Sequence, residues 1–406
     1  MKEGYKQTEL GVIPEDWEIK KLRDCSLIPG KYGINAPAVE FSNDLPTYLR
    51  ITDIDDDGNF ISFNKVSVND MESNNFLLEN EDLVFARTGA TVGKSYLHNS
   101  KLNGNLVYAG FLIMFRLNRE VLLPYYLRLL TQTEKYWNWV KTISMRSGQP
   151  GINSNEYCSL EIPVPPIEEQ NAIANCLSTW DEAIEKQQKL IDAKEIRHKA
   201  LMQKLLSGKK RLPGFTDEWK EVKLGDLFSE RNETKYDDLP LLSIGQEGVY
   251  PQTESNKRDI SNGDKSKYKR IVPSDIGYNT MRMWQGRSAL SSLEGIVSPA
   301  YTILTPKENV DSYFFSLLFK TTRLTNLFWR NSQGLVDDTL NCKYKDFSII
   351  KCNVPSYEEQ NAITEILKIS EAEIEIEKQK VDQLKEQKKA LMQKLLTGKV
   401  RLPLNN

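Results

Sequence analysis

Histidine is scarce in this chain, which has only His98 and His198 among 406 residues. Neither histidine stands in a Ser-His-Asp order, and two distant histidines cannot supply a histidine-rich metal site. No glycine-rich cofactor fingerprint follows an expected strand, and no NPPY-like methyltransferase motif occurs. We therefore predict no catalytic residue, no metal ligand and no enzymatic activity for this chain by itself.

Cysteine is also sparse, with five residues scattered along the chain and no CxxC pair: Cys25, Cys158, Cys176, Cys342 and Cys352. An odd number at long spacings argues against a disulfide framework or a structural zinc site and fits a reducing cytoplasm. The longest apolar runs, such as residues 111–115, are far too short to span a bilayer, and no apolar signal region opens the chain. We expect a cytoplasmic protein with no membrane partner.

Neither sign of charge is in clear excess, because 54 basic residues face 56 acidic ones. The chain therefore has no global basic field, and any nucleic-acid binding must come from local patches or from partners. The length of 406 residues favours two or more domains. A hydrophobic content of 39% is enough to build their cores.

The chain repeats itself. EEQNAIANCL at 168–177 returns as EEQNAITEIL at 358–367, and KALMQKLL at 199–206 returns letter for letter at 389–396. Both pairs have the same offset, from 168 to 358 and from 199 to 389. Upstream, Trp17 recurs as Trp219. The chain therefore consists of two copies of one unit, each a variable segment followed by a nearly constant one.

Each constant segment reads as one long helix, over 166–207 and 356–397. No glycine or proline interrupts either segment after its first turn, and Gly208 and Gly398 suit the C-terminal caps. Apolar residues recur in steps near 3.5, as in a coiled-coil seam. The seam residues are Ile173, Leu177, Trp180, Ile184, Ile191, Leu201 and Leu205, then Ile363, Leu367, Ile374, Val381, Leu384, Leu391 and Leu395.

Charge predicts how the two helices pair. The first helix is acidic over 166–185 and basic over 186–211, and the second is acidic over 358–377 and basic over 378–401. An antiparallel pair lays each acidic half against a basic half, whereas a parallel pair opposes like charges. We therefore predict an antiparallel coiled coil. The alternative is two separate solvated helices.

The variable segments read as mixed domains, so the predicted fold class is α+β with a pseudo-twofold internal repeat. The domains predicted are 1–165, the central helix 166–211, 212–355 and the C-terminal helix 356–406. β-Branched and aromatic residues predict strands at 48–53, 82–87 and 111–116 before a helix at 124–140. In the second copy the corresponding strands are 241–244, 275–280 and 301–304, and the helix is 312–329.

Loops in the variable segments hold candidate contacts to nucleic acid. Residues 89–95 are one residue short of a phosphate-binding loop, so nucleotide binding is not expected there. A glycine followed by a cation occurs in both copies and suits contacts to a phosphate or a base edge. Simple strand-terminal turns are the alternative. The candidates are Arg87, Thr88, Lys94, Arg146, Gln149, Arg282, Trp284, Arg287, Asn331 and Gln333. The aromatic residues Tyr136, Trp137, Trp139, Phe328 and Trp329 are expected in the core.

The whole pattern resembles the specificity subunit of type I restriction-modification systems, over essentially the full chain. The resemblance rests on a Trp-x-x-x-x-Leu-x-Asp opening at Trp17, a Pro-Pro-x-x-Glu-Gln helix start and the ending LMQKLLSGKKRLPGF at 201–215, all followed by a second copy. The second copy departs from the first in having Ser356-Tyr357 in place of Pro166-Ile167. This change leaves the expected helix start intact.

The resemblance implies that each variable domain is a target-recognition domain that reads one half of a split, asymmetric site in double-stranded DNA. It also implies that the helices set the spacer and dock two methyltransferase subunits, which act with two endonuclease/translocase subunits. S-adenosylmethionine, ATP and magnesium would belong to those partners, and none to this chain. The partner-binding candidates are Glu169, Gln170, Asn171, Gln203, Lys204, Glu359, Gln360, Asn361, Gln393 and Lys394. The alternative function is a coiled-coil scaffold with two protein-binding modules and no DNA contact.

Overall fold

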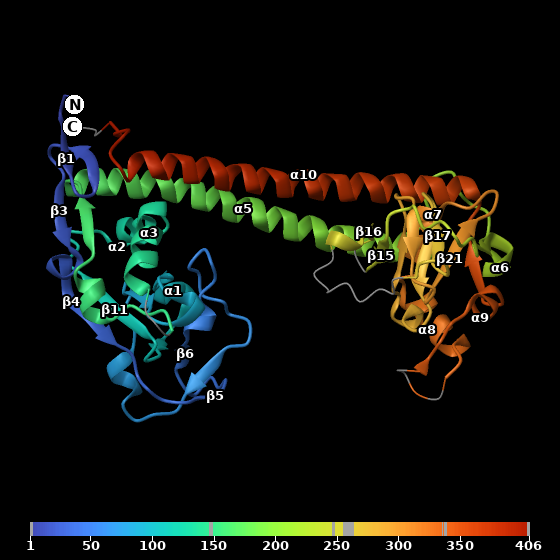
Figure 1. The fold of residues 1–406 in the computed structure, drawn as a ribbon, viewed down its shortest axis with the longest axis horizontal. Helices are drawn as coiled ribbons and strands as arrows, with labels where there is room; N and C mark the ends of the chain where they lie inside the picture. The colour runs from blue at the N-terminus through green and yellow to red at the C-terminus, as the bar shows by residue number, and fades with distance from the viewer. Residues whose placement is uncertain are drawn as a thin grey trace. The chain divides into compact units, whose positions relative to one another are not determined.

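The computed structural model describes residues 3–145, 149–245, 248–254, 264–334, 336 and 339–403. The chain divides into two compact units. Unit 1 is Met1–Gln187 with Lys380–Asn406, and unit 2 is Gln188–Gln379. Each unit holds one mixed domain and a part of both long helices, α5 (Ile167–Leu206) and α10 (Tyr357–Leu395) (Figure 1). None of the helices in the described ranges is long and apolar enough to cross a membrane.

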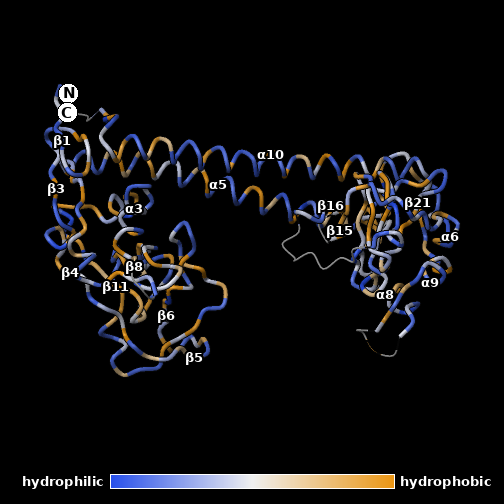
Figure 2. Tube along the Cα trace, viewed as in Figure 1, coloured by the Kyte–Doolittle hydropathy of each residue, from blue (hydrophilic) through white to orange (hydrophobic). Residues whose placement is uncertain are grey.

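The two long helices confirm the sequence prediction closely. Gly208 and Gly398 follow their ends with φ angles of 69° and 67°, the left-handed conformation that a C-terminal cap requires. Polar and apolar residues alternate along both helices (Figure 2). Even the charged seam residues Lys194 and Lys388 are half-buried, as expected for positions that face the other helix.

Ion pairs establish that the helices run antiparallel within each unit. In unit 1, Lys388 Nζ lies 2.6 Å from Asp181 Oδ1. In unit 2, Lys378 Nζ lies 2.7 Å from Glu195 Oε1, and Lys194 Nζ lies 3.2 Å from Glu373 Oε2. Basic residues of one helix thus face acidic residues of the other, as the charge distribution predicted.

The domain of unit 1 contains two four-stranded sheets. The first has the order β4 (Ser26–Tyr32), β11 (Leu112–Leu117), β8 (Leu83–Ala86) and β9 (Ser95–Leu97), all antiparallel. The second has the order β10 (Leu106–Tyr108), β6 (Thr47–Leu49), β7 (Val66–Val68) and β5 (Ala38–Glu40). The smaller elements are the hairpin β1 (Tyr5–Thr8) with β2 (Gly11–Pro14), the pair β3 (Glu18–Lys21) with β12 (Glu161–Val164), and the helices α1 (Ser100–Asn103), α2 (Pro124–Leu130), α3 (Glu134–Ser144) and α4 (Ser154–Cys158).

The domain of unit 2 repeats the first of these sheets, with the order β14 (Phe228–Glu230), β21 (Tyr301–Pro306), β18 (Ile276–Asn279) and β19 (Ser288–Leu290). Three strand pairs accompany it: β13 (Lys220–Lys223) with β22 (Lys351–Val354), β15 (Leu242–Ile244) with β16 (Val249–Pro251), and β17 (Lys269–Ile271) with β20 (Gly295–Val297). Its helices are α6 (Leu224–Leu227), α7 (Ser312–Leu318), α8 (Thr322–Asn331) and α9 (Tyr344–Ser348).

Several local predictions need correction. The helices expected at 124–140 and 312–329 are each two helices, because Thr133 and Thr321 accept backbone N–H groups and start a new helix. The strand expected at 48–53 stops at Leu49, because Asp53 bonds back to Arg50 and closes a 3₁₀ turn.

The aromatic residues are only partly in the core. Tyr136 and Phe328 are buried and Trp139 is half-buried, as expected. Trp137 and Trp329 are 39% and 50% exposed, so the prediction that these two residues lie in the core was wrong. They lie on amphipathic helices whose buried face is already filled by Tyr136, Val140, Leu324 and Phe328.

Candidate nucleic-acid interface

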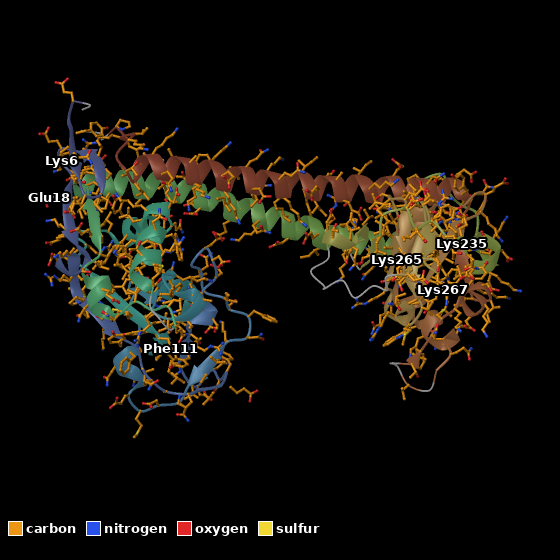
Figure 3. The ribbon with its side chains drawn as sticks, in the orientation of Figure 1. Lys6, Glu18, Phe111, Lys235, Lys265 and Lys267 are labelled. Atoms are coloured by element: carbon orange, nitrogen blue, oxygen red, sulfur yellow. The ribbon has the colours of Figure 1, made fainter. Side chains whose placement is uncertain are left out.

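One edge of the first sheet in unit 1 gathers three residues from the ends of three strands. β4 ends at Tyr32, Arg87 follows the end of β8, and Phe111 precedes β11. The backbone N–H of Arg87 donates to the Phe111 carbonyl at 3.0 Å, which closes this edge. Phe111 is 54% exposed and lies on the part of unit 1 away from α5 and α10 (Figure 3).

The Arg87 side chain stacks on an aromatic ring. Its guanidinium carbon lies 4.8 Å from the centre of the Tyr32 ring, within cation–π range. The Tyr32 hydroxyl accepts the backbone N–H of Ser154 at 3.0 Å, which holds the ring in place. The Nε atom of Arg87 is buried and has no hydrogen-bond partner in the described part of the chain.

A second loop pairs with the residues that follow Arg87 and brings Gln149 to the same turn. Thr88 forms a β-bridge with Gly151, and Ile152 N–H donates to the Arg87 carbonyl at 2.8 Å. A Cβ atom placed on Gly89 would lie 3.2 Å from Gln149 Nε2, so Gln149 sits against the same turn. The structure therefore brings Arg87, Thr88 and Gln149 together. Sequence reasoning missed Tyr32 and Phe111, because exposed aromatic residues at strand ends have no signature of their own.

Lys94 does not join this group. Its ammonium lies 2.7 Å from Asp56 Oδ1 and donates to the Ile54 carbonyl at 3.3 Å, with the side chain only 19% exposed. The hydrogen bond from Lys94 holds the pKa of Asp56 below its ordinary value. Lys94 thus has a partner within the chain, and its contact to nucleic acid stays a prediction. The predicted contact Arg146 lies outside the described residues.

Unit 2 builds the same backbone frame with different side chains. Thr280 N–H donates to the Ala300 carbonyl, and Cys342 N–H donates to the Thr280 carbonyl, as Arg87 does with Phe111 and Ile152. Thr280 therefore stands where unit 1 has Arg87. By the same comparison Arg287 stands where unit 1 has Lys94, because the carbonyls of both accept from the end of the neighbouring strand.

The predicted residues of unit 2 lie around this frame. Arg282 and Arg287 are exposed, and Trp284 between them is half-buried with its Nε1 donating to the Met281 carbonyl at 3.1 Å. Gln333 is exposed and pairs through its backbone with Asn341. Asn331 instead donates its side-chain amide to the Leu327 carbonyl at 2.8 Å, so this amide serves the end of α8.

Four of the predicted partner-binding residues are buried, which corrects the expectation that they form an exposed surface. Gln170 is 0% exposed; it accepts Leu123 N–H and donates to the carbonyls of Val121 and Pro165. Gln360 accepts Asp311 N–H and donates to the Pro355 carbonyl. Both glutamines therefore fasten the start of a long helix to the domain of their own unit.

The adjacent glutamates, Glu169 and Glu359, are each 1% exposed and form equivalent nodes. Glu169 accepts Trp17 Nε1–H at 2.9 Å and is bound through two hydrogen bonds by Arg401. Glu359 likewise accepts from Trp219 at 3.2 Å and from Arg211 twice at 2.7 Å. We call these two groups the tryptophan nodes. Their hydrogen bonds raise the pKa of Arg401 and of Arg211.

The remaining partner-binding candidates are accessible and stay predictions. Four of them are exposed, namely Asn171, Gln203, Lys204 and Lys394. The other two, Asn361 and Gln393, are half-buried. The Asn171 side chain donates to the Ile167 carbonyl one turn earlier on α5.

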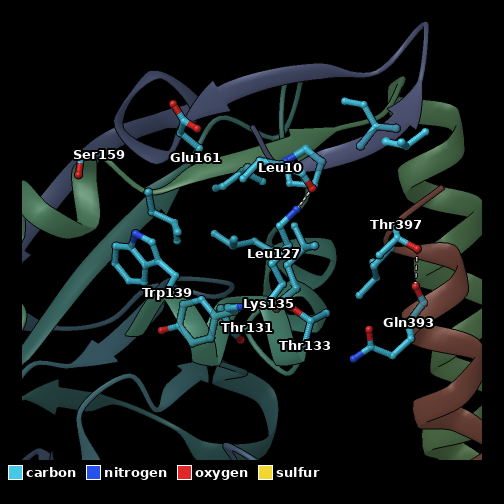
Figure 4. Close-up of a pocket in the computed structure, with 18 residues that line it drawn as sticks. Leu10, Leu127, Thr131, Thr133, Lys135, Trp139, Ser159, Glu161, Gln393 and Thr397 are labelled. Carbon is cyan, nitrogen blue, oxygen red and sulfur yellow. Dashed lines mark hydrogen bonds between the residues drawn. The ribbon is translucent and has the colours of Figure 1, made fainter. Parts of the chain in front are cut away.

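A cavity of about 260 Å³ lies in unit 1 beneath the N-terminal hairpin (Figure 4). Apolar side chains such as Leu127, Leu130 and Trp139 form much of its lining, and Lys135 reaches across it to the Leu10 carbonyl. Burial lowers the pKa of Lys135. Gln393 alone among the predicted site residues lines this cavity, so it is separate from the Arg87 edge. The described residues contain no cluster of His, Cys, Asp and Glu that could hold a metal ion.

Comparison with known proteins shows the family of the chain. The family model "Type I restriction modification DNA specificity domain" matches residues 14–194 and again 216–386. The chain therefore belongs to this family. With two copies of the domain, it is a specificity subunit of a type I restriction-modification system that has two target-recognition domains.

Individual relatives match along nearly the full length. The type I restriction enzyme specificity subunit designated MjaX, from Methanocaldococcus jannaschii, is 28% identical over 98% of this chain and 97% of its own. The HsdS subunit from Thermoanaerobacter tengcongensis shares the fold, with a TM-score of 0.50, 18% identity and coverage of 96% and 98%. A chain from a study of complex assembly in the type I R-M system gives a TM-score of 0.59 at 17% identity, with coverage of 96% and 99%.

Proposed function

We propose that each unit reads one half of an asymmetric, bipartite site in double-stranded DNA through the sheet edge described above. The observation that supports this proposal is the pair of equivalent backbone frames at Arg87 and Thr280, which carry unlike side chains. A constant frame with different side chains suits the same task performed on different base sequences. The long helices would set the spacer between the half-sites.

The chemistry would belong to partners. We propose that two methyltransferase subunits and two endonuclease/translocase subunits assemble with this chain and supply S-adenosylmethionine, ATP and magnesium. The chain would itself be non-catalytic and bind none of these cofactors. The candidates that remain for methyltransferase docking are the exposed residues Asn171, Gln203, Lys204 and Lys394 and the half-buried residues Asn361 and Gln393.

Mapping methylated adenines in cells with and without this chain tests the proposal. We expect one bipartite motif to be methylated only when the chain is present. Exchanging Arg87, Thr88 and Gln149 for alanine should relax or abolish one half of the motif and leave the other half unchanged. A chain that assembles with partners but never binds DNA, or whose binding does not fall with salt, would instead be a protein scaffold.

A further inference from the structure

We propose that the half-site read by unit 1 contains a guanine, and that Arg87 reads its O6 and N7 atoms in the major groove while Tyr32 positions the guanidinium. This inference rests on the proposed function, of which it specifies one base and one pair of atoms. Tyr32 acts through Arg87 and is therefore a positioning residue.

The first step is that Arg87 has free donors where other arginines do not. Among the described residues of unit 1, every other arginine binds an acidic side chain or a carbonyl: Arg23, Arg50, Arg116, Arg119, Arg128 and Arg401. In the same set of residues Arg87 has no acidic partner, and its contact is the face of Tyr32. Because its Nε is buried, the two terminal NH₂ groups of Arg87 are the donors that remain available to a ligand.

The second step is geometric. A guanidinium that stacks on a ring by its flat face keeps its N–H groups in a plane parallel to the ring, so they stay free to donate to a ligand at its edge. That planar fork matches two acceptors side by side, and guanine presents O6 and N7 in this way in the major groove. The Ser154 N–H bond to the Tyr32 hydroxyl fixes the platform before DNA arrives.

The third step is the surroundings of the fork. Phe111, whose carbonyl accepts the Arg87 N–H, is 54% exposed. Thr88 follows Arg87 in the chain, and Gln149 on the neighbouring loop lies against Gly89. An exposed aromatic ring suits contact with a thymine methyl or an adjacent sugar, and neutral amide and hydroxyl groups suit further base edges. No acidic residue within the described ranges binds Arg87, so DNA would not have to displace an internal ion pair there.

Unit 2 provides an internal control. Thr280 occupies the equivalent place, and its short neutral side chain donates to the Ala300 carbonyl at 3.2 Å. A threonine has no two-pronged fork for guanine. The half-site of unit 2 should therefore lack this particular readout at the equivalent position.

The experiment measures binding of the full chain to duplexes that carry its methylated motif, with each guanine of one half-site replaced in turn by 7-deazaguanine, which lacks only N7. We expect one replacement in the unit 1 half-site to weaken binding about 2- to 12-fold, because the analogue removes one of the two acceptors of a bidentate base contact. With Arg87→Met, which keeps the length of the side chain and has no hydrogen-bond donor, the same replacement should have no effect. Tyr32→Ala should reduce the response, and Tyr32→Phe should retain more of it because the ring remains.

Thr280→Ser is the matched control and should leave the response at the unit 1 guanine unchanged. The inference is overturned if no guanine in that half-site responds, or if Arg87→Met responds as fully as the native chain. If the native chain shows no sequence-specific binding to DNA, the proposed function itself is refuted. Specific binding that is indifferent to 7-deazaguanine would refute only the guanine assignment.

Discussion

Replacing Glu169 with alanine should destabilise unit 1 by about 3 kcal/mol, because it removes the acceptor of a buried tryptophan node. The Trp17 side chain is 0% exposed, so water cannot replace the lost partner of its Nε1–H group. A buried donor left without an acceptor costs about 1–3 kcal/mol. The lost bonds to Arg401 add about 1 kcal/mol rather than more, since Asp16 still binds that guanidinium and the site is partly open to water.

Hydrogen exchange on the full chain in mild denaturant can measure this loss for each unit separately. The opening free energy of peptides from β3 and β12 should fall, whereas peptides from β13 and β22 in unit 2 should be unchanged. Glu168→Ala is the matched control, because Glu168 lies in the same helical turn with the same charge but is exposed. Glu169→Gln keeps an acceptor for Trp17 and should lose about half as much. If Glu169→Ala is no worse than Glu168→Ala, the node does not stabilise the unit.

Three further predictions concern the helices, the thiols and the second recognition site. Inserting seven residues after both Gln187 and Gln379 preserves the heptad seam and adds about 10 Å of helix, so the spacer of the methylated motif should lengthen by about three base pairs. An unaltered spacer in a folded, active chain would show that the helices do not set its length. Burial raises the pKa of three thiols, to about 11 for Cys25 and to about 12 for Cys342 and Cys352. In the folded chain these thiols should resist alkylation by iodoacetamide. The free energy of unfolding should fall as pH rises from the ordinary thiol pKa of 9.0 toward these values, because the unfolded chain then releases protons that the folded chain retains. Chemical denaturation at pH 8 and at pH 10 checks whether stability falls in this direction. Arg287→Ala should weaken recognition of one half-site only, as footprints on duplexes with each half altered would show.

The long helices could be predicted from sequence because their determinants are local. The heptad seam and the glycine after each C-terminal end act within a few turns of helix. The opposite charges of the two helix halves can also be seen directly in the sequence. The breaks at Thr133 and Thr321 were missed, although threonine is a helix-capping residue. A threonine within an otherwise periodic segment becomes a cap only when the chain turns there, and packing of the following helix decides that turn.

The buried helix starts could not be predicted in the same way. The repeated letters Glu-Glu-Gln read equally well as an exposed docking motif, because the groups that bury them are distant in sequence. Trp17 and Arg401 bind Glu169 from positions more than 150 residues away. A usable signal did exist: Trp17 and Trp219 recur together with the two glutamates, which is what a shared buried contact would produce.

The difference between side-chain contacts and backbone contacts explains why the two copies keep some residues and change others. Each tryptophan node joins three separate segments: the start of a domain, the start of one long helix and the tail that follows the other long helix. A change in any one of them leaves a buried donor or acceptor unpaired, so all three are held constant together. Arg87 and Thr280 sit in a frame made by backbone hydrogen bonds, which do not depend on the side chain. Recognition can therefore diverge at these positions without loss of the fold, and specificity is most readily altered where the backbone alone maintains the structure.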